Sequence, residues 1–167
     1  EATSGRPGPV YLELPVDVLN DSTSEDSEVI FPVTQVTSKA VDREKSKDLM
    51  ELIGQAQKPI IVAGSGAWYS DAGEELAKFA DKPGVPIFTQ ANGRGVVPDS
   101  HPVCFGGILG IRPGAGAYAG FLTDLVILLG TRLNLFTLFG GVFNPAAKTV
   151  QGDIEPEGMV RNRQVDL

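Results

Sequence analysis

The stretch from Asp124 to Asn134, DLVILLGTRLN, limits what this chain can fold into more than any other part of it. Its five consecutive apolar residues are typical of a strand that is buried on both faces of a parallel sheet. Gly130 ends the run, and Thr131 and Arg132 follow at once. Ligands of open α/β sheets lie just beyond the carboxyl ends of the strands, so these residues indicate an anion or nucleotide site. The alternative is a strand that stops at a glycine, with Arg132 in solvent.

Strand and helix patterns alternate along the rest of the chain, which predicts the α/β class with a mainly parallel sheet. Asp71 and Glu74 have the spacing of a helix cap, so the second helix is expected to begin near residue 70. The Gly- and Pro-rich span 90–113 is too long for a simple connection and is expected to be functional or to contain short elements. The expected helices are 43–57, from 70 or 71 onward, 114–120 and 155–162; the expected strands are 10–14, 60–63, 85–88, 125–129 and 149–151.

The amino-terminal part reads as separate from this pattern. Residues 20–27, NDSTSEDS, are polar and acidic and have no apolar face to bury, which is typical of a linker. We therefore expect residues 1–20 to belong to a preceding domain, residues 21–42 to connect, and residues 43–167 to form the compact domain. The chain begins without a methionine, and residues 165–167 look like the start of another strand. It is thus expected to be a piece of a longer protein, truncated at its carboxyl-terminal end.

Composition excludes several classes of function. Apolar residues make up 42% of the 167, which allows a packed core, and a net charge of −7 argues against a general nucleic-acid binder. Cys104 is the only cysteine and His101 the only histidine, so neither an internal disulfide nor a Cys/His zinc set can form. Catalysis by this pair is not expected. No apolar run approaches the roughly 20 residues of a membrane span, and no signal peptide opens the chain.

Gly64-Ser65-Gly66 is a second candidate for ligand binding, because it lies between a predicted strand and a predicted helix. A full dinucleotide fingerprint would have glycine or alanine at position 69, where Tyr69 stands, so a standard NAD site is disfavoured. The backbone amides of the two glycines remain available in principle for a phosphate or ribose. The alternative is a tight turn without a ligand.

Further candidates are weaker. Asp153 follows a strand, where a carboxylate can accept hydrogen bonds from ribose hydroxyls, but it can equally cap a helix that opens at Pro156. Trp68 and Tyr69 can stack on a base or cover the core. Arg112, Arg161 and Arg163 are available for phosphates or for solvent. With no carboxylate pair, Ser/His/Asp set or Walker loop, the chain reads as a binding or structural domain rather than a complete enzyme.

Several blocks in sequence resemble the thiamine-diphosphate-dependent enzymes. GRPGPVYLELPVDVL (5–19) resembles the end of their pyrimidine-binding domain. The blocks that resemble their central domain are AQKPIIVAGSG (56–66), GVPIFTQANGRGVVPDSHPVCFGGILG (84–110), DLVILLGTRLN (124–134) and GDIEPEGMVRNRQVDL (152–167). The resemblance is to the acetolactate synthase, benzaldehyde lyase and oxalyl- or 2-hydroxyacyl-CoA lyase group. It implies a Rossmann-like parallel sheet of about six strands with helices on both faces.

The resemblance also implies ligands, partners and site residues. Some relatives hold FAD in this domain, some hold ADP, and in others the pocket is empty. The matching nucleotide contacts in this chain would be Gly64, Gly66, Gly130, Thr131, Arg132, Asp153 and Ile154. The implied parent is a cytoplasmic homodimer or homotetramer that uses thiamine diphosphate and magnesium, with flanking pyrimidine- and diphosphate-binding domains. It would act on a C–C bond next to the carbonyl of a 2-oxo acid, 2-hydroxy ketone or acyl-CoA.

Some family features are absent. Arg112 stands where flavin-binding relatives usually have a histidine, and the glutamate that activates the thiazolium belongs to the preceding domain. The magnesium motif is not matched, because Ile154 follows Gly152-Asp153. The chain itself is therefore expected neither to bind thiamine diphosphate nor to catalyse a reaction. The alternatives are a stand-alone nucleotide-binding regulatory module and, less favoured, an NAD-dependent dehydrogenase.

Overall fold

The computed structural model describes residues 2, 5–6, 8–22, 40–109, 114–155, 157, 159 and 162–167. The chain divides into two units, Glu1–Lys39 and Ala40–Leu167. In the first unit the described residues form one short helix, α1 (Val16–Leu19). The strand predicted over 10–14 is wrong, because these residues belong to no strand of the described chain.

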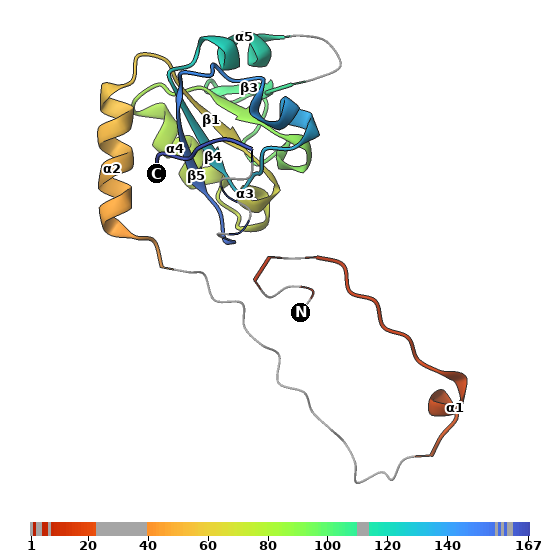
Figure 1. Cartoon of the computed structure of the whole chain (residues 1–167). Helices are drawn as coiled ribbons and strands as arrows, with labels where there is room; N and C mark the ends of the chain where they lie inside the picture. Colours follow the sequence, from red (N-terminus) through yellow and green to blue (C-terminus); the bar gives the residue numbers. More distant parts are fainter. Residues whose placement is uncertain are drawn as a thin grey trace. The chain divides into compact units, whose positions relative to one another are not determined.

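The second unit is built on a parallel sheet of five strands (Figure 1). These are β1 (Pro59–Ala63), β2 (Ile87–Thr89), β3 (Cys104–Gly107), β4 (Leu125–Leu129) and β5 (Lys148–Gly152). They lie in the order β3-β2-β1-β4-β5. The chain runs outward from β1 through β2 to β3, then crosses back to β4 on the other side of β1. The boundary between β1 and β4 is thus the point where the winding reverses, as in doubly wound nucleotide-binding folds.

Helices cover both faces of this sheet. Helices α2 (Arg43–Gln55), α3 (Ser65–Tyr69) and α4 (Gly73–Asp81) pack against one face, where Ile61 and Ile127 are completely buried. Helix α5 (Ala115–Leu122) lies on the other face, over the side chains of Val62, Val126 and Leu128. Both faces of β1 and β4 are therefore buried, as their unbroken apolar runs predicted. The fold class is confirmed: α/β, Rossmann-like, with five strands where about six were expected.

Two stretches differ from the prediction. The helix expected from residue 70 is α4, which begins at Gly73, and the sequence did not predict the short helix α3 that precedes it. Asp71, with a positive φ of 53°, turns the chain between the two helices. Asp71 cannot cap in this position, and Ala72 stands at the start of α4 without a side-chain hydrogen bond. The span 90–113 contains β3 and a 3-10 turn, η1 (Ala91–Gly93). Strand β3 was missed because it is an edge strand of composition CFGG, half of it exposed.

The last residues lie beside β5. The amide of Asp166 donates to the Thr149 carbonyl at 2.8 Å, and the amide of Gln151 donates to the Leu167 carbonyl at 3.0 Å. Residues 165–167 thus take the sixth position at the edge of the sheet without forming a regular strand. The helix predicted over 155–162 falls largely on Pro156, Gly158, Val160 and Arg161, which lie outside the described residues.

Candidate functional site

Four neighbouring strands bring their following residues into one row at the carboxyl edge of the sheet. Ala63 of β1 is paired with Thr89 of β2 and with Leu129 of β4, and Leu129 is paired with Gly152 of β5. The residues that follow on these strands, Gln90, Gly64, Gly130 and Asp153, are therefore neighbours. All seven predicted contacts lie along this row or directly after it. The row spans the reversal point of the winding, which is where open α/β sheets bind ligands.

The glycines of the row pack against one another. A Cβ on Gly66 would lie 2.7 Å from the Gly130 Cα, and a Cβ on Gly64 would lie 2.4 Å from the Thr131 Cβ. The amide of Gly64 donates to the Leu129 carbonyl, and the amide of Gly66 donates to the Gly130 carbonyl, both at 2.9 Å. These two amides, which the sequence left available for a phosphate, are thus already used. The glycines allow the backbones after β1 and β4 to touch.

Arg132 supplies the positive charge of the edge. Its guanidinium lies 2.5 Å from a carboxylate oxygen of Glu155, and the side chains of the two residues are 27% and 44% exposed. Arg132 is therefore not left in solvent, as the alternative interpretation of the sequence expected, whereas the anion or nucleotide site at this position stays a prediction. Glu155 was not singled out from the sequence, although it stands two residues after Asp153.

Two buried glutamines hold the loop that carries Arg132. The side-chain amide of Gln90 donates to Asn134 Oδ1 at 2.7 Å and to the Arg132 carbonyl at 3.4 Å. The side-chain amide of Gln151 donates to the Thr131 carbonyl at 3.1 Å. Sequence reasoning missed both glutamines; the signal for them is a glutamine near the end of a predicted strand. Asn134 also caps η2 (Leu135–Gly140), whose Phe136 amide it accepts at 3.0 Å.

Asp153 and Ile154 lie at the β5 end of the row. Asp153 Oδ1 accepts the amide of Glu155 at 3.1 Å, which forms a local turn directly after β5. The helix that Asp153 would cap opens at Pro156, which lies outside the described residues. The second oxygen of this carboxylate takes part in no hydrogen bond among the described residues. Ile154 is exposed at the rim. Asp153 thus supplies an acceptor beside the Gly130 turn.

The other candidates serve different roles. Trp68 and Tyr69 are more than half exposed and meet edge to face, with ring centroids 5.4 Å apart, so neither covers the core. Arg163 donates to the Asn144 and Ala147 carbonyls at 2.7 and 2.6 Å. Burial lowers the pKa of the Arg163 guanidinium, and the attraction of Asp166 opposes this shift. Arg112 and Arg161 lie outside the described residues.

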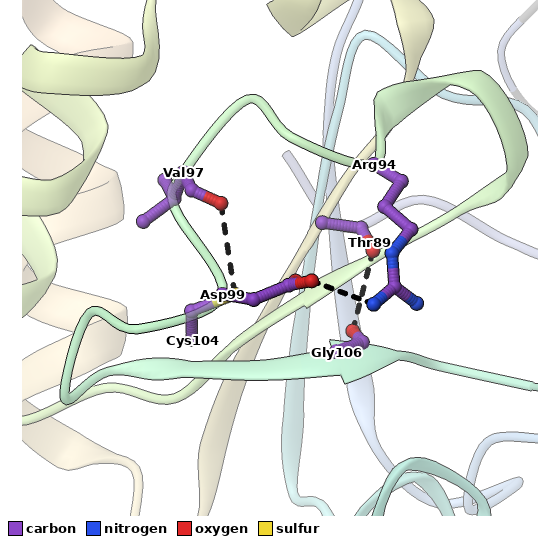
Figure 2. Close-up of polar contacts among 6 residues, drawn as sticks. All are labelled: Thr89, Arg94, Val97, Asp99, Cys104 and Gly106. Atoms are coloured by element: carbon purple, nitrogen blue, oxygen red, sulfur yellow. Dashed lines mark hydrogen bonds and ion pairs between the residues drawn. The ribbon is translucent and has the colours of Figure 1, made fainter.

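The connection between β2 and β3 is held by its own contacts (Figure 2). Arg94 pairs with Asp99 at 2.6 Å, and the Thr89 hydroxyl donates to the Gly106 carbonyl at 3.3 Å. The Cys104 thiol points to the Val97 carbonyl at 3.8 Å, whereas the His101 imidazole faces Asp81 on α4 at 3.7 Å. These contacts give Cys104 and His101 separate partners within the fold.

The described part of the chain lacks metal-binding and membrane-spanning features. It holds no group of three His, Cys, Asp or Glu residues placed to bind a metal ion. None of its helices has the length and hydropathy needed to span a bilayer.

The strand order and the helices on both faces define a doubly wound, Rossmann-like α/β domain. Residues 46–167 match the family described as "Thiamine pyrophosphate enzyme, central domain". The chain belongs to this family, as its sequence blocks predicted.

Curated relatives agree with this assignment. The chain is 34% identical over 170 residues to oxalyl-CoA decarboxylase of Escherichia coli, which covers 98% of this chain and 28% of that protein. It is 31% identical over 177 residues to a probable acetolactate synthase large subunit of Methanocaldococcus jannaschii, and this match covers 99% of this chain and 29% of that protein. It is 30% identical over 141 residues to 2-hydroxyacyl-CoA lyase 1 of Dictyostelium discoideum, and this match covers 82% of this chain and 23% of that protein. The chain thus spans less than a third of the length of each relative.

A solved structure shares the fold. The X-ray structure of a candidate thiamin diphosphate-dependent enzyme from Mycobacterium smegmatis superposes with a TM-score of 0.62 at 23% identity. The match covers 79% of this chain and 27% of the other.

Proposed function

We propose that this chain is the scaffold domain of a larger thiamine-diphosphate-dependent enzyme and that it carries an adenine-nucleotide site for FAD or ADP. The observation that carries the proposal is the row formed by Gly64, Gly130 and Asp153 at the carboxyl ends of β1, β4 and β5. Arg132 and Asp153, on adjacent strand ends of this row, offer one cation and one acceptor.

The residues of the row fit a nucleotide in two respects. A guanidinium binds phosphate oxygens through paired N–H groups, and Arg132 is 27% exposed, so a ligand can reach it. A carboxylate after a strand accepts ribose hydroxyls, and Asp153 has an oxygen available for this. The amides of Gly64 and Gly66 do not fit this purpose, because each already donates to the backbone. A bound nucleotide would therefore be held by side chains after β4 and β5 rather than by a glycine-rich loop.

Membership of the family supports a proposal for the reaction of the parent. We infer that the parent forms or breaks a C–C bond next to the carbonyl of a 2-oxo acid, a 2-hydroxy ketone or an acyl-CoA, with thiamine diphosphate and magnesium supplied by flanking domains. Those domains are the expected partners of residues 40–167, and residues 1–20 are expected to continue the preceding one. The parent is expected to be a homodimer or homotetramer in the cytoplasm. In this proposal the chain contributes binding and support, and no catalytic group.

Calorimetry with ADP, FAD and CoA tests the nucleotide site. We expect saturable binding of ADP or FAD by the wild-type chain and loss of the signal in Arg132→Ala, because the side chain that pairs with phosphate is removed. Arg43→Ala is the matched control, since Arg43 is exposed at the start of α2. Equal binding by wild type and Arg132→Ala would contradict the assignment of Arg132.

A stand-alone regulatory module is the alternative, and it uses the same residues. It predicts the same binding but no flanking cofactor-binding domains. Reading the gene on both sides of this segment separates the two.

A further inference from the structure

The Arg132–Glu155 pair has more structural support than an ordinary surface ion pair. The 2.5 Å contact joins the loop after β4 to the segment after β5. On one side, Gln90 and Gln151 bind the carbonyls of Arg132 and Thr131. On the other side, the amide of Glu155 is bound by Asp153 Oδ1. The backbones at both ends are thus held, so the pair forms without the loss of much additional conformational freedom.

The carboxylate of Glu155 lies where an anionic ligand of Arg132 would bind. We propose that Glu155 acts as an internal competitor for this position and is therefore a specificity-determining residue of the nucleotide site. A ligand carboxylate only replaces one carboxylate by another. A diphosphate carries more charge and more acceptor oxygens, so it can displace Glu155 and bind the guanidinium through two N–H groups. This inference rests on the proposed nucleotide site and names the ligand chemistry that the site selects.

A different role for Glu155 predicts the opposite result. If Glu155 accepted hydrogen bonds from the ribose, its removal would weaken the binding of every adenine nucleoside. If it competes for Arg132, its removal strengthens only ligands that carry phosphate. Adenosine and ADP share the base and ribose and differ in the diphosphate, so this pair of ligands separates the two roles.

The experiment compares ADP and adenosine binding by wild type, Glu155→Gln and Glu74→Gln. Glu74→Gln is the matched control, because Glu74 forms an exposed ion pair with Lys78 on α4 and loses the same charge. We expect Glu155→Gln to bind ADP about two- to fivefold more tightly, the equivalent of about 0.4–1 kcal/mol, which is the usual range for a partly exposed ion pair. Adenosine binding should be unchanged in all three proteins, and Glu74→Gln should bind ADP like wild type.

The outcomes separate this inference from the proposed site. Wild-type binding of ADP with no gain in Glu155→Gln overturns the competitor role and leaves the nucleotide site standing. Weaker binding of both ligands by Glu155→Gln overturns it in favour of a ribose contact. No binding of ADP, FAD or adenosine by any of the proteins overturns both proposals. If Glu155→Gln fails to fold, Glu155→Asp provides the same comparison, because its shorter side chain draws the carboxylate away from Arg132 and should give a smaller gain.

Discussion

Gly130 provides the sharpest test of how the strand ends pack. Its φ is +57°, and a Cβ at this position would lie 2.4 Å from the Ala67 nitrogen and 2.6 Å from the Gly66 Cα. All three close neighbours are backbone atoms at the start of α3, so no side chain can rotate away to make room. Gly130→Ala must therefore either move α3 relative to β4 or abandon the left-handed turn that leads to Thr131 and Arg132.

The size of the effect can be separated into two parts. A non-glycine residue in the left-handed region costs about 1–2 kcal/mol, and forcing additional volume into a packed region costs about 1–3 kcal/mol. We thus expect Gly130→Ala to lower the free energy of unfolding by about 2–5 kcal/mol, a large part of the about 5–15 kcal/mol that is usual for a domain. Gly84→Ala is the matched control, because Gly84 has φ +68° with no atom within 4 Å of the added Cβ. Gly84→Ala should therefore lose only the about 1–2 kcal/mol that a non-glycine residue costs in the left-handed region.

Equilibrium urea unfolding, followed by circular dichroism, measures both variants against wild type. With a slope of about 1–3 kcal/mol per molar urea, the additional loss of about 1–3 kcal/mol in Gly130→Ala is readily resolved as a lower midpoint. Equal midpoints for Gly130→Ala and Gly84→Ala would refute the reasoning. If, in addition, Gly130→Ala lost ADP binding, glycine would be needed there for the approach of a ligand rather than for packing.

Two further predictions concern the opposite, amino-terminal edge of the sheet and the start of α2. Burial raises the pKa of Asp124, but the amides of Gln57 and Lys58, at 2.7 and 2.9 Å, together lower it below its ordinary 3.8. The ionised Asp124 carboxylate therefore gives its full stabilising contribution above pH 3.8, the pKa of this group in the unfolded chain. The contribution is lost as the pH falls through the lower pKa of the folded state. Asp124→Asn should lower the free energy of unfolding by about 1–2 kcal/mol at pH 7. Urea midpoints measured at decreasing pH should show the difference between Asp124→Asn and wild type shrinking below pH 3.8. A difference that stays constant with pH would contradict the role of the ionised carboxylate. Asp42 Oδ1 accepts the amides of Glu44 and Lys45 at 2.9 and 3.3 Å and so caps α2. Asp42→Ala should therefore lower the free energy of unfolding, measured by thermal unfolding, by about 1 kcal/mol, whereas Asp48→Ala within α2 should not. Equal losses in the two variants would exclude the cap.

The core strands could be predicted because the residues that specify each strand are consecutive in the sequence. A strand buried on both faces must be apolar at every position, so β1 and β4 are visible as runs of consecutive apolar residues, and β4 was predicted with its observed bounds. Helix α2 was visible for the same reason through its apolar stripe. Strand β3 has no such signature, because an edge strand alternates between core and solvent and this one has only four residues. The left-handed Asp71, which separates α3 from α4, also had no local signal.

The sequence by itself determined the α/β class, the family, and the glycine, arginine and carboxylate that follow the strands. These properties depend on residue types and short spacings, which remain the same however the chain is folded. The tertiary structure decided which of these residues meet. Only the strand order places the loop after β4 between the loops after β1 and β5. This arrangement brings the backbone of Gly130 into contact with the backbones of Gly64 and Gly66. The same strand order pairs Arg132 with Glu155, 23 positions away.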